Sequence, residues 1–280
     1  MREAEPPMAR EDVPNPAERL RRLVEETGEL EQAMERLVAE RGVPKRVAEA
    51  LACGLSLLPR RYDRNAGTLG CPGQKRLLEA KVLVAGLGGL GGYVAEELAR
   101  CGTGTLVGVD SDRFDETNLN RQLFADRSTI GLPKTGVAGK KLAAVNEAVE
   151  FLPYRCEVED LPETAYAHVD VLFDCLDRIP SKLHLQDMGE RFGIPLVHGA
   201  IGGWYGQVAV VWPGSRLLST LYHGKREGIE KELGNPPFTP AVVGSLMVTE
   251  GVKVLLGKKS REDAVLFIDL LNSQWEPIRF

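Results

Sequence analysis

A glycine-rich turn directly after a short apolar stretch limits the possible folds of this chain more than any other feature. Residues 81–85, KVLVA, are mostly apolar. Such a run before glycines predicts a central parallel strand that is buried on both faces and is followed by a helix. We therefore expect an α/β protein that holds a nucleotide beside this turn. The glycines of the turn are Gly86, Gly88, Gly89, Gly91 and Gly92.

Three of these glycines have the spacing G-x-G-x-x-G. Gly86 would permit the tight turn, Gly88 would let a phosphate approach the backbone, and Gly91 would let the helix pack on the strand. Gly89 adds backbone freedom at the start of the helix. The helix N-terminus would then offer N–H groups and its positive dipole end to the phosphates. Taken alone, the motif also fits a glycine-rich turn without a ligand.

A carboxylate follows at the spacing that nucleotide binding requires. A second apolar strand, 105–109, ends in Asp110, which lies 19 residues after Gly91. That spacing is close to the roughly 20 residues expected for an acid that binds a ribose hydroxyl. Up to this point the pattern fits a dinucleotide and ATP equally well.

Polar and cationic side chains beyond Asp110 favour a triphosphate. Asn118 and Arg121 follow within a dozen residues, and Lys134 comes soon after them. Each alone could be an ordinary surface residue. Together they suit a triphosphate whose α-phosphorus is attacked, because neutralising its oxygens lowers the barrier to an incoming carboxylate.

Two further carboxylates follow the apolar strand expected at 169–173. The carboxyl end of a parallel strand faces the ligand crevice, so Asp177 is a candidate ligand for Mg²⁺ that bridges the phosphates. Asp174 could instead cap the turn after the strand.

The ordered set of these motifs resembles the ThiF/MoeB/HesA family, the bacterial relatives of ubiquitin-activating enzymes. The resemblance extends from about residue 60 to the C-terminus, and RYDR at 61–64 looks like the family's R-Y-x-R motif. The other matching motifs are GLGGLG at 86–91, Asp110, NLNRQ at 118–122, GLPK at 131–134 and DCLD at 174–177.

The resemblance implies an activity and a set of partners. Members of the family bind ATP with Mg²⁺ and adenylate the C-terminal glycine carboxylate of a small ubiquitin-like sulfur-carrier protein, releasing pyrophosphate. The carrier would serve sulfur transfer in molybdopterin or thiamine biosynthesis. Catalysis would need no general base, because the attacking carboxylate is already ionised near pH 7.

The resemblance also implies a role for each matching residue. Asp110 would hold the ribose, Asn118, Arg121 and Lys134 would hold the phosphates, and Asp177 would hold the magnesium. Arg64 would reach the γ-phosphate of the ATP in a partner subunit, which would make a homodimer part of the site. The catalytic set would then be Arg121, Lys134, Asp177 and Arg64.

Three departures from the family pattern limit the expected chemistry. Members often carry two C-x-x-C pairs that bind zinc, whereas the five cysteines of this chain form no such pair, so we expect no zinc site. Several members also place a reactive cysteine after the region of Asp177, but no cysteine follows Cys175 here. We therefore expect the chemistry to stop at the acyl adenylate, with sulfur supplied by a separate donor. Arg178 stands where the family usually has asparagine.

The expected fold is a Rossmann-like, doubly wound, mainly parallel α/β sheet that antiparallel strands continue. Residues 1–59 would form an N-terminal helical extension, which is typical of the HesA-like branch, with about the first 15 residues disordered. Residues 60–280 would form the adenylation domain. Its ATP-binding half would span about 77–200 and its carrier-docking half about 201–280.

Within this organisation, one helix should run from Asn15 to Gly42 and a second from Pro44 to about Leu58. Residues 60–80 should form a polar approach to the first strand, 199–206 a glycine-rich crossing, and 217–240 a mobile loop over the carrier tail. Further strands are expected at 155–158, 194–198, 207–212, 266–270 and 277–280, and further helices at 93–100, 135–147, before 192 and at 244–256.

Composition limits the partners and the compartment. The formal net charge of −5 indicates no excess of positive charge that would attract nucleic acid or an anionic membrane, so we expect neither as a partner. The N-terminal segment lacks the apolar core of a secretion signal, and no uninterrupted apolar run approaches the roughly 18 residues of a membrane span. A cytoplasmic location is the resulting expectation.

Two other functions remain open at this point. An NAD-dependent oxidoreductase would use the same glycine turn and Asp110, but it would leave Arg121, Lys134 and Asp177 without a function. A non-catalytic nucleotide-binding partner module would keep the fold and lose turnover. The adenylyltransferase is the function that uses every one of these residues.

Overall fold

The computed structural model describes residues 15–225, 228, 230–258 and 264–280. It divides into two units, Met1–Lys75 and Arg76–Phe280. The division therefore falls later in the chain than the expected boundary between residues 59 and 60. The disorder expected for about the first 15 residues concerns 1–14, which lie outside the described part of the chain.

The first unit is helical, but its first helix is interrupted. Gly28 adopts a left-handed backbone conformation with φ of 72° and donates its N–H to the carbonyl of Val24, which ends one helix where a single helix to Gly42 was expected. The segment 60–80, expected to be a polar approach, is also largely helical. The elements are α1 (Pro16–Thr27), α2 (Leu30–Arg41), α3 (Lys45–Gly54), η1 (Arg60–Asn65) and α4 (Gly70–Glu79), which runs across the boundary between the units.

A small apolar core holds α1, α2 and α3 together. Leu20, Leu23 and Leu37 are fully buried in it, together with Ala48 and Ala52 of α3. The expected helical extension is thus a packed bundle with its own core.

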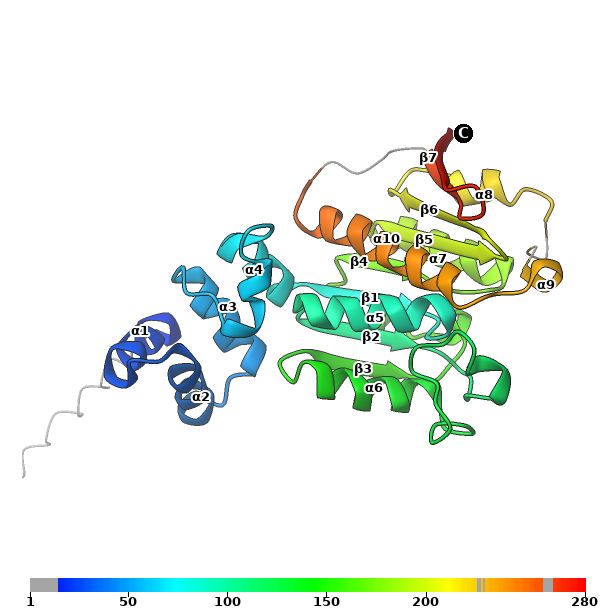
Figure 1. Ribbon diagram of the computed structural model, residues 1–280. Helices are drawn as coiled ribbons and strands as arrows, with labels where there is room; N and C mark the ends of the chain where they lie inside the picture. The colour runs from blue at the N-terminus through cyan, green and yellow to red at the C-terminus, as the bar shows by residue number, and fades with distance from the viewer. Residues whose placement is uncertain (1–14, 226–227, 229, 259–263) are drawn as a thin grey trace, which may run out of the picture. The chain divides into compact units, whose positions relative to one another are not determined.

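The second unit contains one eight-stranded sheet with the order β3-β2-β1-β4-β5-β6-β7-β8 (Figure 1). The first five strands in this order are parallel and the last three pair antiparallel, which confirms the expected fold class. The strands are β1 (Lys81–Ala85), β2 (Thr105–Val109), β3 (Glu150–Tyr154), β4 (Val171–Asp174), β5 (Leu196–Gly202), β6 (Tyr205–Val211), β7 (Ala264–Asp269) and β8 (Gln274–Arg279).

The strand order reverses between β1 and β4. From β1 the chain moves outward through β2 to β3, and it then returns to place β4 on the other side of β1. The crossover connections on either side of such a reversal leave a crevice at the carboxyl ends of the two central strands. This arrangement locates the ligand crevice after Ala85 and Asp174.

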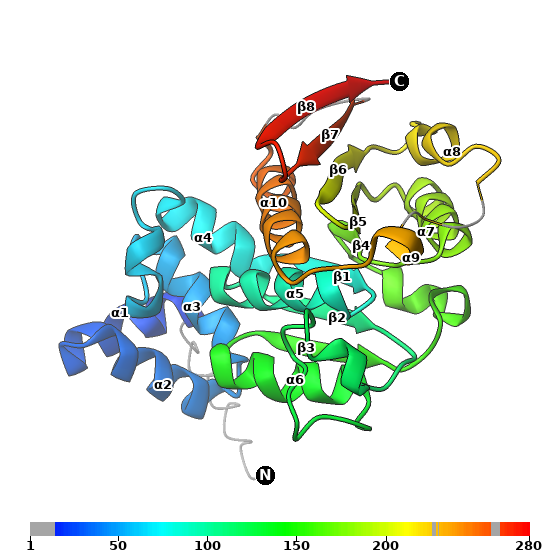
Figure 2. The ribbon, with the colours of Figure 1, turned by 45° about the vertical axis from the view of Figure 1, so that its right-hand side comes forward.

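Helices cover both faces of the sheet. Figure 2 shows α5, α6 and α10 on one face, and α7 and α8 on the other. The helices are α5 (Gly89–Cys101), α6 (Lys134–Val145), α7 (Ile179–Phe192), α8 (Leu217–Leu221), α9 (Glu230–Leu233) and α10 (Phe238–Leu255), with short turns η2 (Glu116–Asn118), η3 (Val158–Asp160) and η4 (Glu163–Tyr166).

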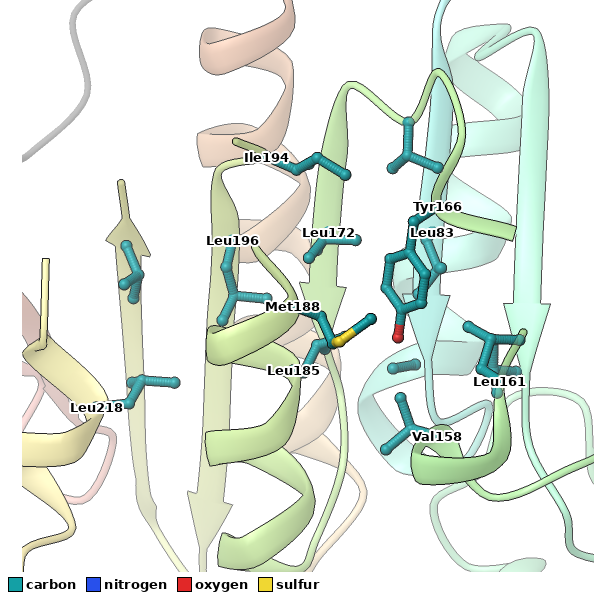
Figure 3. Close-up of a cluster of buried hydrophobic side chains, with 14 of the residues drawn as sticks. Leu83, Val158, Leu161, Tyr166, Leu172, Leu185, Met188, Ile194, Leu196 and Leu218 are labelled. Atoms are coloured by element: carbon teal, nitrogen blue, oxygen red, sulfur yellow. The ribbon is translucent and has the colours of Figure 1, made fainter. Parts of the chain in front are cut away.

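The larger core cluster fixes the central strands to α7. In Figure 3, Leu83 of β1 and Leu172 of β4 lie with Leu185 and Met188 of α7 around the ring of Tyr166. The two strands and α7 are therefore held by the same packed layer. Because the crevice is formed by the ends of these elements, its walls are held by this core.

Helix α10 is long and apolar enough to cross a membrane by length and composition alone. It instead packs on α5 and on β4, β5 and β6. Glycines make this packing close: a Cβ on Gly251 would lie 2.2 Å from the ring of Phe173, and one on Gly244 would lie 2.9 Å from Tyr93. It is a core helix of the α/β unit, and it begins at Phe238 rather than at the expected residue 244.

Two expectations about strands are wrong. The strand expected at 155–158 lies at 150–154 and contains Pro153, which is tolerated because β3 is an edge strand. The glycine-rich crossing at 199–206 consists instead of the paired ends of β5 and β6. A Cβ on Gly199 would lie 2.2 Å from Met247, and one on Gly206 would lie 2.3 Å from Val243. These glycines therefore admit α10 against the strands.

Candidate active site

A pocket of about 300 Å³ lies in the crevice at the carboxyl ends of β1 and β4. Its size is that of a small-molecule site. Most of the residues predicted from the sequence to bind a nucleotide lie around it: Gly86, Gly88, Gly89, Asp110, Arg121, Lys134 and Asp177. The fold thus collects in one place residues that are separated by up to 91 positions in the chain, from 86 to 177.

The glycine turn needs glycine at two of its positions for steric reasons. Gly86 has φ of 86°, and a Cβ there would lie 2.7 Å from the carbonyl oxygen of Cys175. A Cβ on Gly91 would lie 1.7 Å from the carbonyl oxygen of Gly86, so α5 lies directly on the end of β1. The three atoms nearest to a Cβ on Gly88 would all belong to the side chain of Gln122, at 3.4 Å or more, so no backbone atom crowds this position of the pocket wall.

Helix α5 presents its N-terminus to the pocket. Its N-cap residue is Gly88, which has no side chain to satisfy the first N–H groups, and Gly89 and Leu90 of the first turn line the pocket. Unsatisfied N–H groups and the positive end of the helix dipole favour an anion here. A phosphate group is the kind of ligand that this end suits.

Asp110 directly follows β2, lines the pocket and is hydrogen-bonded to the glycine turn. Its Oδ2 accepts the N–H of Leu87 at 2.7 Å, and its Oδ1 accepts the N–H of Asp112 at 2.9 Å. Burial raises the pKa of this carboxyl, although Lys134 and the two N–H groups oppose the rise. The orientation of the carboxyl is thus fixed, and each oxygen keeps a lone pair for a ligand hydroxyl.

The cations Arg121 and Lys134, predicted from the sequence to bind phosphates, both line the same pocket. The Nζ of Lys134, at the first position of α6, lies 2.8 Å from Oδ2 of Asp112 and 3.8 Å from Oδ2 of Asp110. Arg121 donates from NH1 to the carbonyl of Thr117 at 3.1 Å and to Oδ1 of its neighbour Asn120 at 2.9 Å. Arg121 is therefore held by neutral oxygens that leave its charge uncompensated, whereas Lys134 is held beside two carboxylates.

Asn118 and Arg64 are not among the residues that line this pocket. The side chain of Asn118 accepts the N–H of Asp115 at 3.2 Å and closes a capping box on η2, and its carbonyl accepts the N–H groups of Arg121 and Gln122. Asn118 thus holds the loop that carries Arg121. Arg64 lies in η1 of the first unit. Direct contact of either residue with a nucleotide stays a prediction.

Arg178 occupies the rim of the pocket and turns towards acidic residues. Its NH2 lies 3.0 Å from Oε2 of Glu157 and 3.3 Å from Oε1 of Glu159, and Ser111 donates to the other oxygen of Glu157 at 2.6 Å. The arginine at the position of the family's usual asparagine therefore connects the loops after β2, β3 and β4. Asp177 beside it stays exposed.

Two residues of the site were missed by the sequence analysis. Gln122 is buried at the pocket wall, and its Oε1 has no hydrogen-bond partner among the described residues, which makes it a candidate ligand contact. In the sequence it belongs to the NLNRQ motif at 118–122, which contributed to the family resemblance without assigning a role to this residue. Lys182 also lines the pocket. It lies in α7 at a buried position, where the amphipathic pattern predicts an apolar residue.

A buried polar network lies directly behind the pocket. Asp174 accepts the N–H of Leu176 at 3.1 Å, so it does cap the turn after β4. Its two oxygens also lie 3.2 and 3.3 Å from Nζ of Lys182, and its Oδ2 lies 2.7 Å from Nδ1 of His198. On the other side of the imidazole, Nε2 lies 3.1 Å from the hydroxyl of Tyr222.

The protonation states in this network follow from burial and neighbours. Burial and the nearby ammonium of Lys182 lower the pKa of His198, while Lys182 and the histidine lower the pKa of Asp174 against the effect of burial. The histidine is therefore neutral, with its proton on Nδ1 donated to Asp174 and its Nε2 accepting.

Replacing His198 by asparagine should reduce the fall in the free energy of unfolding between pH 7.5 and pH 5.5. Because the folded pKa of His198 is lowered, its share of stability is complete above the unfolded pKa of about 6.5 and is lost as the pH falls below it, with a slope of up to about 1.4 kcal/mol per pH unit. Urea unfolding at pH 7.5 and 5.5 checks this, followed by the fluorescence of the tryptophans, all of which lie in the second unit. Asp174 stays ionised throughout this window, and equal slopes in both proteins would contradict the assignment.

The cysteines at the pocket are poor nucleophiles. Cys156 and Cys175 both line it, and burial raises the pKa of each thiol, with the Asp174 carboxylate adding to the effect on Cys175. Within the described residues no group of three or more histidine, cysteine, aspartate or glutamate side chains is placed to hold a metal ion. A cation at Asp177 would therefore need further ligands from a bound molecule, which fits Mg²⁺ carried by phosphates.

Comparison with known proteins identifies the family. Residues 62–280 match the ThiF family. The chain belongs to that family. Its helices α1 to α3 precede the matched region, and the particular resemblance to the HesA-like branch stays a prediction.

Several ThiF-type relatives cover most of this chain. It is 32% identical to the "SAMP-activating enzyme E1" of Haloferax volcanii, over 79% of this chain and 84% of that protein. It is 36% identical to the "Sulfur carrier protein adenylyltransferase" of Thermus thermophilus, over 75% and 82%. Among solved structures, E. coli MccB with ATP has a TM-score of 0.64 at 17% identity, covering 88% of this chain and 82% of that one, which supports the same fold.

Proposed function

We propose that this chain is an ATP-dependent adenylyltransferase that activates the C-terminal glycine carboxylate of a small ubiquitin-like sulfur-carrier protein. The product is an acyl adenylate, and pyrophosphate is released. The observation that carries the proposal is the convergence of Asp110, the N-terminus of α5, Arg121, Lys134 and Asp177 on one pocket. The names of the relatives from Haloferax and Thermus point to the same chemistry.

Each group at the pocket has a role in holding MgATP. Asp110 accepts the ribose hydroxyls, and the N–H groups at the start of α5 receive phosphate oxygens. Arg121 and Lys134 neutralise the charge on the phosphates. Asp177 contributes a ligand to Mg²⁺, which supplies further neutralisation of the phosphate oxygens when it is bound.

The reaction then depends on alignment and charge. A carboxylate oxygen of the carrier forms a bond to the α-phosphorus, and the bond from that phosphorus to the bridging oxygen breaks. Pyrophosphate leaves with the electron pair, and no proton has to be removed from the attacking carboxylate. The cations and N–H groups stabilise the charge that develops on the phosphate oxygens.

A second pocket gives the carrier tail a path to the nucleotide. It has a volume of about 520 Å³ and includes Tyr205, Tyr222 and Phe267 in its wall. It shares Lys182 and Ile201, among other residues, with the nucleotide pocket. A flexible tail lying along this largely aromatic and aliphatic surface would bring its terminal carboxylate to the phosphates. This supports the expected assignment of residues 201–280 to carrier docking.

The chain depends on other protein subunits for sulfur transfer and for a complete active site. Because the thiols of Cys156 and Cys175 are kept neutral, the acyl adenylate is the end product here, and a separate protein donates sulfur. Arg64 completes the site of the partner subunit in a homodimer. The enzyme works in the cytoplasm and serves molybdopterin or thiamine biosynthesis.

Carrier-dependent exchange of pyrophosphate into ATP tests the proposal. The assay uses small proteins that end in Gly-Gly as candidate carriers, with the same proteins truncated by those two residues as controls. We expect exchange only with an intact carrier. Tight ATP binding without exchange for any carrier would support a non-catalytic module, and binding of NAD in preference to ATP would support an oxidoreductase.

A further inference from the structure

The two pockets meet at a boundary that contains one fixed positive charge. The residues shared by both are Asp177, Lys182, Ala200 and Ile201. Of these, Asp177 is an anion and Lys182 a cation, while the other two are apolar. Of the four, only Lys182 can donate a charge-assisted hydrogen bond from its side chain to an arriving carboxylate.

Lys182 is almost fully buried and is held rigidly. Its side chain is 4% exposed, and its Nζ lies 3.2 and 3.3 Å from the two oxygens of Asp174 and 2.9 Å from the carbonyl oxygen of Gly199. Behind it, His198 fixes Asp174, and Tyr222 in turn fixes His198. The ammonium therefore has no freedom to swing away from the boundary.

The ammonium also has capacity for one more acceptor. It carries three N–H groups. Among the described residues, Nζ lies at hydrogen-bond distance from three acceptor atoms, the two oxygens of Asp174 and the carbonyl oxygen of Gly199. The nearly equal distances to the two Asp174 oxygens fit one N–H that both oxygens share, which leaves the third N–H for another acceptor.

We propose that Lys182 binds the terminal carboxylate of the carrier tail and positions it for attack on the α-phosphorus. The inference rests on the proposed function and assigns one residue of that site. No proton is transferred in this step. The hydrogen bond from Lys182 to one carboxylate oxygen leaves the other oxygen to form the bond to phosphorus, with pyrophosphate as the leaving group.

Discrimination between a carboxylate and a carboxamide tests this role. The probes are an N-acetylated decapeptide that ends in Ala-Ala-Gly-Gly with a free carboxylate, and the same peptide as its C-terminal amide. Their Kd values are measured by titration calorimetry with α,β-methylene-ATP and Mg²⁺ present. We expect the wild-type chain to prefer the carboxylate by at least tenfold, as charge-assisted hydrogen bonds exceed neutral ones.

The test variant is the double substitution Asp174→Asn with Lys182→Met, because Lys182→Met alone would leave Asp174 buried without its partner. We expect its two Kd values to agree within twofold, with the amide bound as in the wild type. Lys140→Met, which replaces an exposed lysine of α6, should keep the tenfold preference. Thermal unfolding and the Kd of the ATP analogue establish that each variant is folded.

Three outcomes would overturn the inference. They are the absence of a carboxylate preference in the wild type, a preference retained in the double variant, and an equal loss of affinity for both peptides, which indicates a structural role. Carrier-dependent exchange by the wild type is measured in parallel. Exchange without discrimination rejects Lys182 and keeps the proposed function, whereas discrimination without exchange rejects the proposed function and keeps the carboxylate site.

Discussion

Replacing Arg121 or Asp177 by alanine should lower the rate of acyl-adenylate formation by about 10²–10³-fold, equivalent to about 2.7–4 kcal/mol of transition-state stabilisation. Both side chains line the nucleotide pocket. Arg121 would neutralise phosphate oxygens and Asp177 would hold Mg²⁺, and neither is part of the buried core. Single-turnover measurements with saturating ATP and carrier give the rate, and thermal unfolding should match that of the wild type.

Matched controls separate a local role from a general loss of charge. Arg127→Ala removes an exposed arginine from the same loop as Arg121, and Asp187→Ala removes an exposed aspartate from α7. Both lie outside the pocket lining and should leave turnover within twofold of the wild type. Near-normal turnover in Arg121→Ala and Asp177→Ala together would remove the basis for the assigned roles.

Replacing Gly91 by alanine should destabilise the second unit by at least about 3 kcal/mol, the upper end of the usual cost of overpacking. The new Cβ would lie 1.7 Å from the carbonyl oxygen of Gly86 and 2.7 Å from its carbonyl carbon. Because both contacts are backbone atoms, no side chain can move aside, and α5 must shift from β1. Urea unfolding followed by tryptophan fluorescence measures the change.

Gly136→Ala is the matched control for that substitution. Gly136 lies in α6, and a Cβ there would have no atom within 4 Å. Alanine should therefore stabilise the unit by about 0.5–1 kcal/mol through helix propensity. A Gly91→Ala protein as stable as the wild type would show that the helix does not lie on the strand as described.

The strands that carry the glycine turn and Asp110 were predicted with their correct bounds, and the reason is local. Each is a five-residue apolar run with a clear end, at the glycines in one case and at Asp110 in the other. By contrast, β3 contains Pro153 and is only partly buried, so neither its hydrophobicity nor its composition distinguishes it from a loop. Its pairing with β2 determines its position.

The residues of the pocket also differ in whether the local sequence or the tertiary structure determines their position. Asp110, Arg121 and Lys134 belong to contiguous motifs whose spacing can be read along the chain. Lys182 and His198 owe their place to the approach of α7 and β5 around Asp174, which no local pattern records. The glycines of β5 and β6 were mistaken for a loop because the sequence alone does not reveal that α10 presses on them.

The wall that the two pockets share fixes the distance between the nucleotide and the second pocket. Ala200 and Ile201 belong to β5 and pair with Gln207 and Gly206 of β6, so their backbone is held by the sheet itself. The distance between the nucleotide and the second pocket is consequently set by the hydrogen-bonded backbone of β5 and β6 and not by movable side chains. Only a carrier tail whose length matches this distance would place its terminal carboxylate at the nucleotide. This is a physical reason for a carrier to end at a defined glycine.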